Sequence, residues 1–128
     1  MSHVLRRVPG TFAVARLDPN EGWPWWATRS AAFASVTRTP HETSVVCDAA
    51  SVPPTARAER DFALYGVEGP IPFAVVGVLA SLVQPLADAG ISVVTVSTYD
   101  TDYLLCSLAS EARTVTAWRE AGHTVHPD

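Results

Sequence analysis

The sequence predicts an α+β fold in which antiparallel sheets carry helices on one face. Three observations indicate this fold. Residues 77–106 contain, in order, a helical pattern, a strand pattern, a tight turn and a second strand pattern. A second helical pattern and a short strand pattern follow near the C-terminus. When the sequence is shifted so that Thr39 falls on Thr98, Cys47 falls on Cys106, which indicates a weak internal repeat of the strand–turn–strand pattern.

The first helix is predicted over residues 78–89. Apolar side chains recur there at helical spacing and give the helix one face that can lie on a sheet: Leu79, Leu82, Val83 and Leu86. Gly90 ends the helix, because glycine readily adopts the left-handed conformation that closes a helix. Pro85 lies inside the helix and has no N–H, so we expect one missing hydrogen bond near Ser81 and a kink.

The second half of the chain is predicted to have the order β-α-β-β-α-β. A turn at Tyr99-Asp100-Thr101 connects two strands, the first of them rich in β-branched residues. The final helix begins with Ser110 as its N-cap and ends at Gly122. The predicted strands are residues 62–67, 91–98, 102–108 and 123–126. This order places two helices on one face of an antiparallel sheet.

The first half shows the same order in a weaker form. Its short helices are predicted over residues 25–29 and from Pro53 through about Glu59. Its predicted strands are residues 11–17, 32–38 and 43–48, and a strand at 4–8 can complete this sheet from the N-terminus. We therefore expect two intimately joined units, residues 1–61 and 62–128.

Composition narrows the class of protein. The chain has 128 residues, of which 48% are hydrophobic and 17% charged, as expected for a packed protein. All nine basic residues are arginine and the formal net charge is −4, which argues against a nucleic-acid partner. No apolar run approaches the roughly 18 residues that a membrane-spanning helix needs. The N-terminus lacks the apolar segment of a secretory signal, so we expect a cytoplasmic protein.

Signals for catalysis or metal binding are weak. The sequence contains no P-loop, no dinucleotide-binding glycine motif after a strand, no nucleophile elbow and no H-E-x-x-H motif. Asp100 and Asp102 are two residues apart, but both fit the predicted turn better than a pair of catalytic carboxylates. His123 and His126 point to opposite faces of a strand, which is poor geometry for a metal. We therefore predict no catalytic residues, no metal and no cofactor.

The remaining chemistry-bearing residues are interpreted as structural. Cys47 and Cys106 occupy equivalent strand positions and are predicted to be small buried hydrophobic side chains. Three tryptophans lie within four residues of one another: Trp23, Trp25 and Trp26. Packing against the first sheet is the favoured interpretation of this cluster, and a docking patch or aromatic cage is the alternative.

The second half resembles an ACT domain, on the residues GVLASLVQPLADAGISVVTVSTYDTDYLL. The segment SVTRTPHETSVVC carries the resemblance in the first half, and FALYGVEGPI connects the two. The whole chain thus resembles one tandem pair of ACT units of the kind found in the CASTOR-type amino-acid sensors. This resemblance implies tandem ferredoxin-like βαββαβ units. The sensors carry two such pairs in one chain, whereas this sequence holds one pair. The resemblance therefore also implies a homodimer, which would restore the arrangement of four modules.

The resemblance further implies a ligand site where two modules meet edge to edge. Carried over by position, the site consists of the loop that opens the first helix, the start of the following strand, and the hairpin: Val75, Val76, Gly77, Val78, Ile91, Ser92, Val93, Thr98, Tyr99 and Asp102. Backbone N–H groups at a helix start suit a ligand carboxylate, and Gly77 lets that backbone come close. Asp102 is the expected partner of the ligand's cationic group.

Three functions are compatible with these features. The leading hypothesis is a non-catalytic regulatory protein that binds a small amino acid between ACT modules and thereby shifts its assembly or its binding to a protein partner. The alternative is an ACT-fold interaction module that binds no ligand and works through a sheet edge or through the tryptophan cluster. The least supported possibility is a small enzyme that uses Asp100, Asp102 or a cysteine.

Overall fold

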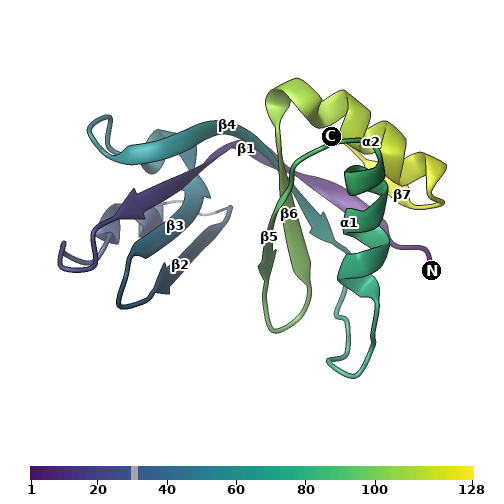
Figure 1. Ribbon diagram of the computed structural model, residues 1–128, viewed down its shortest axis with the longest axis horizontal. Helices are drawn as coiled ribbons and strands as arrows, with labels where there is room; N and C mark the ends of the chain where they lie inside the picture. Colours follow the sequence, from purple (N-terminus) through teal and green to yellow (C-terminus); the bar gives the residue numbers. More distant parts are fainter. Residues whose placement is uncertain (30–31) are drawn as a thin grey trace. The chain divides into compact units, whose positions relative to one another are not determined.

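The computed structural model describes residues 1–29 and 32–128. The chain forms two compact units, which are described separately below (Figure 1). Unit 1 consists of residues 1–9 and 63–128, and unit 2 consists of residues 10–62. The sequence places the first nine residues in the first unit, whereas here they belong with the C-terminal half of the chain.

Unit 1 has the predicted α+β architecture. The C-terminal part of β4 (Arg57–Val67) is followed by α1 (Val78–Asp88) and by β5 (Val94–Ser97) with β6 (Asp102–Ser107). A 3₁₀ turn, η3 (Leu108–Ser110), then leads into α2 (Glu111–Glu120) and β7 (Thr124–His126). β5 and β6 pair antiparallel, with Val94 opposite Leu105 and Ser97 opposite Asp102. The predicted order of two helices and four strands is therefore confirmed.

The N-terminal strand of unit 1 corrects one prediction. β1 (Val4–Leu17) begins in unit 1, and its residues Val4–Arg6 pair in parallel with Thr124–His126 of β7. Residues 4–8 are predicted from the sequence to complete the sheet of the first half instead. The physical reason is hydrophobic burial, because Leu5 is fully buried in the same core as Trp118 and Val125.

Helix α1 follows the sequence prediction closely. Leu82 and Leu86 are fully buried, and Gly90 has a φ of +72°, as expected for a glycine just beyond a helix end. Pro85 leaves the carbonyl of Ser81 without a helical donor. That carbonyl lies 3.0 Å from the Nε2 of His123, so a side chain from another element replaces the missing backbone bond.

The core of unit 1 is built around large side chains. Trp118 and Tyr65 are both fully buried, with ring centroids 5.3 Å apart in an edge-to-face arrangement. The indole N–H of Trp118 donates to the carbonyl of Leu82 at 2.9 Å, so α2 is held to α1 by a buried hydrogen bond as well as by packing.

The bounds of several elements in unit 1 differ from the predicted ones, and for two of them the physical reason is clear. β5 begins at Val94 rather than at Ile91. Ile91 is buried in the core, and its N–H donates to the carbonyl of Leu86 at 2.8 Å, so it closes the helix instead of starting the strand. β6 ends at Ser107, whose side-chain oxygen accepts a hydrogen bond from the N–H of Ser110 and caps the 3₁₀ turn before α2.

Unit 2 has strands in similar positions, and its described residues (10–29 and 32–62) form only short 3₁₀ helices. The C-terminal part of β1 pairs antiparallel with β3 (Thr43–Asp48), which pairs antiparallel with β2 (Ala34–Arg38). The predicted short helix is present as η1 (Trp25–Arg29). The core consists mainly of small side chains: Ala13, Ala15, Ala27, Val45, Cys47 and Val52.

The second predicted helix of this half is misplaced. The 3₁₀ turn η2 spans Ala49–Ser51, and the N-terminal part of β4 begins at Arg57, inside the segment expected to be helical. Pro53 and Pro54 have no N–H groups, and the chain there makes one turn, in which the N–H of Ala56 donates to the carbonyl of Pro53. Beyond it, exposed and half-buried residues alternate, as in a strand.

Both cysteines are buried and unpaired, as predicted. Burial, assisted by the nearby Asp48, raises the pKa of the Cys47 thiol to about 11. The structure contains no helix, within residues 1–29 and 32–128, that is long and apolar enough to cross a membrane.

Candidate ligand-binding site

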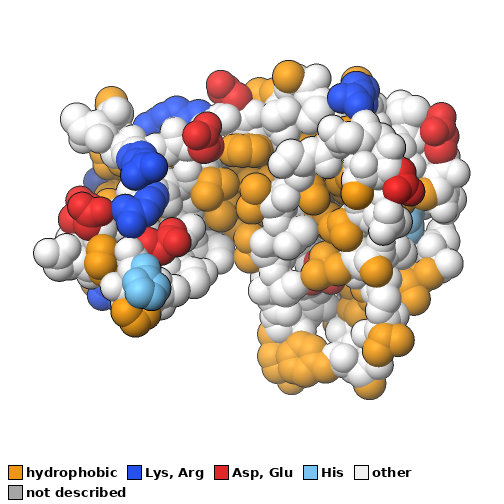
Figure 2. Space-filling view, viewed as in Figure 1, with side chains coloured by type: hydrophobic (Ala, Val, Ile, Leu, Met, Phe, Trp, Pro, Cys, Tyr) orange, Lys and Arg blue, Asp and Glu red, His pale blue; other side chains and the backbone are white. Residues whose placement is uncertain are grey.

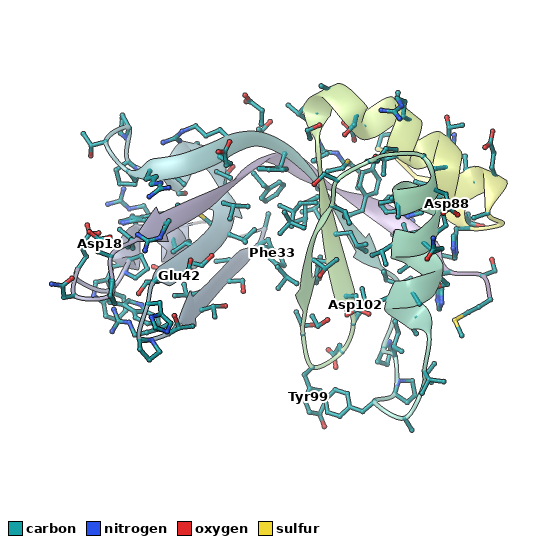
Figure 3. All side chains as sticks on the ribbon, viewed as in Figure 1. Asp18, Phe33, Glu42, Asp88, Tyr99 and Asp102 are labelled. Atoms are coloured by element: carbon teal, nitrogen blue, oxygen red, sulfur yellow. The ribbon has the colours of Figure 1, made fainter. Side chains whose placement is uncertain are left out.

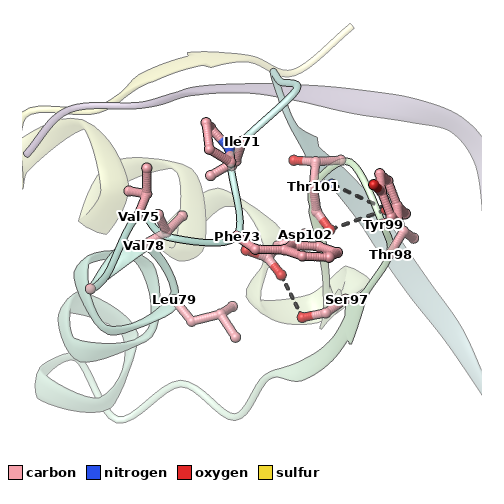
Figure 4. Close-up of a pocket in the computed structure, with 12 residues that line it drawn as sticks. Ile71, Phe73, Val75, Val78, Leu79, Ser97, Thr98, Tyr99, Thr101 and Asp102 are labelled. Carbon is pink, nitrogen blue, oxygen red and sulfur yellow. Dashed lines mark hydrogen bonds between the residues drawn. The ribbon is translucent and has the colours of Figure 1, made fainter.

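Unit 1 contains a pocket between the loop that precedes α1 and the β5–β6 hairpin (Figure 4). Its volume is about 330 Å³, within the range of small-molecule sites. Twelve residues line it: Ile71, Pro72, Phe73, Val75, Gly77, Val78, Leu79, Ser97, Thr98, Tyr99, Thr101 and Asp102. The pocket therefore joins a helix start to a hairpin turn.

The helix side of the pocket offers backbone N–H groups. Gly77 is the N-cap of α1 and has a left-handed backbone, with a φ of +80°. A Cβ at Gly77 would meet only the terminal methyl of Met1, at 4.0 Å, so backbone conformation rather than crowding favours glycine here. Ser81 is the first residue whose N–H bonds back to the Gly77 carbonyl, which leaves the N–H groups of the preceding turn without helical acceptors.

The hairpin side supplies one carboxylate. Asp102 lies opposite Ser97 in the register of β5 and β6, and the Ser97 hydroxyl donates to its Oδ1 at 2.5 Å (Figure 4). The turn itself is closed by Thr98 and Thr101, since the Thr98 N–H donates to the Thr101 carbonyl and the Thr101 N–H donates to the Thr98 hydroxyl. Asp102 is thus held at the base of a well-bonded turn.

The loop before α1 is attached to this turn. The N–H of Ile71 donates to the carbonyl of Asp100 at 2.7 Å, and the Thr101 hydroxyl donates to the carbonyl of Val67. Phe73 and Tyr99 touch edge to face, with ring centroids 4.8 Å apart, although they are 74% and 81% exposed. Figure 3 shows Tyr99 at the tip of the hairpin and Asp102 farther along it. The two aromatic rings therefore form the rim of the pocket.

The exposed rim is apolar. Val75 and Val76 are also exposed, and Figure 2 shows hydrophobic side chains gathered at the end of unit 1 where the loop and the hairpin turn lie. Asp102 carries the only acidic or basic side chain among the described residues that line the pocket. The pocket thus combines apolar walls, one carboxylate and the N–H groups of a helix start.

Six of the ten residues predicted from the sequence line this pocket: Val75, Gly77, Val78, Thr98, Tyr99 and Asp102. Val76 is 81% exposed and lies outside the lining. The three residues predicted at the strand start, Ile91, Ser92 and Val93, do not line it either, because β5 begins only at Val94 and Ile91 is committed to the core.

Six lining residues are not among those predicted from the sequence: Ile71, Pro72, Phe73, Leu79, Ser97 and Thr101. Ser97 follows from the hairpin, since a two-stranded register that pairs the turn-flanking residues places it opposite Asp102. Phe73 follows from the loop, where a large aromatic side chain stands among prolines with no strand or helix pattern to bury it. Leu79 was assigned to the apolar face of the helix but is only half-buried.

Other candidate residues lie outside the pocket. Asp100 is exposed and borders a smaller neighbouring hollow, which the Phe73–Tyr99 pair also lines. In the part of the chain that the structure describes, no group of three or more histidine, cysteine or acidic side chains could hold a metal ion.

The tryptophan cluster departs from the packing interpretation. Trp25 is 71% exposed and Trp23 is 41% exposed, and only Trp26 packs against the core of unit 2. The guanidinium of Arg38 lies 5.1 Å from the ring centroid of Trp23, a cation–π contact that already occupies this ring. A 3₁₀ helix as short as η1 can direct only part of its side chains toward the sheet.

A second polar cluster lies elsewhere in unit 1. The Nε of Arg7 and the hydroxyl of Tyr65 both donate to the same carboxylate oxygen of Glu111, each at 2.7 Å. Burial raises the pKa of the Tyr65 phenol, and the hydrogen bond to Glu111 acts in the same direction. This cluster connects β1 and β4 to the first turn of α2, so its role is structural.

Comparison with known proteins supports this description. The ACT domain family matches residues 57–119, which include every residue that lines the pocket. A second family, described as an N-terminal domain, matches residues 10–55. No curated protein sequence matches the chain significantly.

Three solved structures have similar folds. The Thermus thermophilus aspartate kinase regulatory subunit, in its ligand-free form, has a TM-score of 0.58 and 11% identity over 95% of this chain and 94% of that chain. A Vibrio cholerae protein of unknown function, VC0802, described as a possible transport protein, has a TM-score of 0.74 and 16% identity over 94% of this chain and 90% of that chain.

The third structure is similar in sequence as well as in fold. Protein Atu0741 from Agrobacterium tumefaciens is 32% identical, with a TM-score of 0.91 over 98% of this chain and 92% of that chain. The chain therefore belongs to the same family as protein Atu0741, and its residues 57–119 match the ACT domain family.

Proposed function

We propose that this chain is a non-catalytic regulatory module that binds a free amino acid in the pocket between the α1 loop and the β5–β6 hairpin. The observation that carries the proposal is the opposition, across one pocket, of a helix N-terminus and the carboxylate of Asp102. An amino acid has a carboxylate, which suits the helix N-terminus, and an ammonium group, which suits the carboxylate of Asp102.

The regulatory role rests on the ACT-domain match and on a fold shared with a regulatory subunit of aspartate kinase. In this proposal the chain is a tandem ACT protein of the CASTOR type, it works as a homodimer, and it is located in the cytoplasm. Ligand binding stabilises one arrangement of the dimer, and the output is a change in assembly or in binding to a protein partner. Such a shift is limited by the ligand's differential affinity for the two arrangements, typically about 1–3 kcal/mol.

The test is a thermal-shift screen against the twenty amino acids, followed by calorimetry of each one that raises the melting temperature. A ligand that binds only the folded state stabilises it by mass action, so the rise must grow with ligand concentration. Asp102→Asn is expected to weaken binding, and Asp100→Asn, two residues away and outside the pocket, is the matched control. A flat screen at millimolar concentrations contradicts the proposal.

One observation favours a second candidate, a ligand-free interaction module. Trp23 and Trp25 are exposed in unit 2 and touch edge to face, with ring centroids 6.4 Å apart. Exposed tryptophans are enriched at protein interfaces. If a protein partner is retained equally with and without amino acids, and the double change Trp23→Ala and Trp25→Ala abolishes its binding, this second function replaces the first.

A further inference from the structure

We infer that the bound amino acid has an uncharged apolar or aromatic side chain, and that the pocket discriminates against acidic and cationic amino acids. The inference rests on the proposed function and adds the class of ligand. It depends on the charges and walls of the pocket, which the structure gives in detail.

The charges of the pocket match those of a simple zwitterion. Asp102 is the one charged side chain in the described lining, and the N–H groups that open α1 are the complementary site for a carboxylate. An aspartate or glutamate ligand brings a second carboxylate for which no arginine, lysine or histidine side chain lines the pocket. That group would lie near Asp102 in a partly desolvated space, where like charges repel.

The charged groups that line the pocket also disfavour lysine and arginine as ligands. Once Asp102 binds the α-ammonium group, a cationic side chain finds no second carboxylate in the lining. Asp100 is the nearest acidic residue along the hairpin, but it is exposed and borders a smaller neighbouring hollow instead of this pocket. An ion pair in that position is screened by water and contributes little.

The walls select for apolar side chains. Ile71, Val75 and Leu79 line the pocket, and the Phe73–Tyr99 pair forms its rim (Figure 4). Aromatic rings at such an edge favour a further edge-to-face contact or the burial of a branched aliphatic group. A volume of about 330 Å³ also accommodates a large side chain, so phenylalanine and leucine should fill the pocket better than glycine or alanine.

The test is calorimetry of the full chain with phenylalanine, leucine, alanine, aspartate and lysine. Phenylalanine or leucine is expected to bind at least about tenfold more tightly than the other three. Phenethylamine and 3-phenylpropionate, which lack the carboxylate and the ammonium group respectively, are each expected to bind more weakly than phenylalanine. Asp102→Asn should weaken phenylalanine binding by about tenfold or more, because a charge-assisted hydrogen bond is lost, whereas Asp100→Asn should leave it unchanged.

A gain-of-function variant completes the experiment. Val75 is 44% exposed at the pocket wall, so Val75→Arg adds a cation without disturbing the core. This variant is expected to gain aspartate binding, and Val75→Gln is its uncharged control. If aspartate or lysine binds the unmodified chain most tightly in a manner sensitive to Asp102→Asn, the inference is overturned while the proposed function stands. If no amino acid binds, both are overturned.

Discussion

Unit 1 and unit 2 share an order of strands and helical segments but differ in what fills the helical positions. Unit 1 has α-helices of 11 and 10 residues, and unit 2 has 3₁₀ helices of 5 and 3 residues. The cores also differ. Large side chains such as Trp118 and Leu82 fill the core of unit 1, and small side chains such as Ala13 and Val45 fill the core of unit 2.

This difference explains why the candidate pocket lies in unit 1. A carboxylate site at a helix start requires several aligned N–H groups and a chain that approaches in a left-handed conformation, and α1 with Gly77 provides both. The 3₁₀ helices of unit 2 are too short to offer such a site. A shared order of elements therefore does not imply a shared binding function.

The largest expected effect comes from the core of unit 1. Replacing Trp118 by alanine removes a fully buried indole and its hydrogen bond to Leu82, so the free energy of unfolding should fall by about 3–5 kcal/mol. Val45→Ala in unit 2 should cost about 2 kcal/mol, because only two methyl-sized groups are lost. Urea unfolding followed by circular dichroism measures both. If the two variants lose equal free energies of unfolding, the large core of unit 1 and the small core of unit 2 contribute equally to stability, and the proposed difference between the units is wrong.

The second prediction concerns the polar cluster on α2. Glu111 accepts hydrogen bonds from Arg7 and Tyr65, and the side chain of Arg7 is only 13% exposed. Glu111→Gln should lower the free energy of unfolding by about 2–3 kcal/mol, because it removes the negative charge that lies 2.7 Å from the largely buried Arg7 guanidinium.

The matched control for Glu111 is a second ion pair in the same unit. Arg6 and Glu68 lie 3.4 Å apart with side chains 60% and 53% exposed, so Glu68→Gln should change stability by less than about 0.5 kcal/mol. Both variants are measured by urea unfolding at neutral pH. A loss at Glu68 as large as that at Glu111 would contradict the assignment of the stabilisation to burial.

The third prediction tests the backbone of the pocket. Gly77→Ala should cost about 1 kcal/mol, because alanine at a φ of +80° is strained even though nothing crowds its Cβ. Gly22 in unit 2 also has open space around a built Cβ, and its φ is not in the left-handed region. Gly22→Ala should therefore be neutral within about 0.5 kcal/mol. If the two variants have the same effect in urea unfolding, backbone conformation is not what requires glycine at the start of α1.

Much of unit 1 could be predicted because its signals are local. The spacing of Leu82 and Leu86, the glycine after the helix and the turn at Asp100 each depend on neighbouring residues alone. Errors arose where distant parts of the chain compete for the same residue. Residues 4–6 pair with β7 because the core of unit 1 recruits Leu5, and no local pattern reveals that partner.

The candidate site was predictable to the same extent. The resemblance to ACT domains, and not a local pattern, predicted the loop at Gly77 and Val78 and the carboxylate of Asp102, and all three residues line the pocket. The stretch from Ile91 to Val93 is predicted as a strand because its residues have high β-propensity. In the structure Ile91 instead closes α1, since its N–H donates to the Leu86 carbonyl and its side chain is buried in the core. The packing interpretation of Trp25 failed because aromatic composition predicts large contact area without saying whether the contact lies inside the chain.

The smallest expected effect is a pH dependence confined to unit 1. His3 stacks on His123 with ring centroids 5.8 Å apart, and its Nε2 is buried with no hydrogen-bond partner among the described residues. Burial, followed by repulsion from His123 and from the N-terminal ammonium group, lowers the pKa of His3 below its ordinary value of 6.5, and Asp102 opposes this only in part. The unfolded chain therefore binds more protons at His3 than the folded chain does as the pH falls below about 6.5.

The contribution of His3 to stability is thus complete above that pH and is lost as the pH falls toward the lowered pKa of the folded state. His3→Phe retains a ring against His123 and removes the titrating group. Urea unfolding at pH 7.5 and at pH 5.5 should show a smaller acid loss of stability in this variant than in the parent chain. His41 is exposed in unit 2, and His41→Phe serves as the control. An unchanged acid loss in His3→Phe would mean that another group in the chain carries the pH dependence, and unit 1 would then not be distinguished from unit 2 by its response to acid.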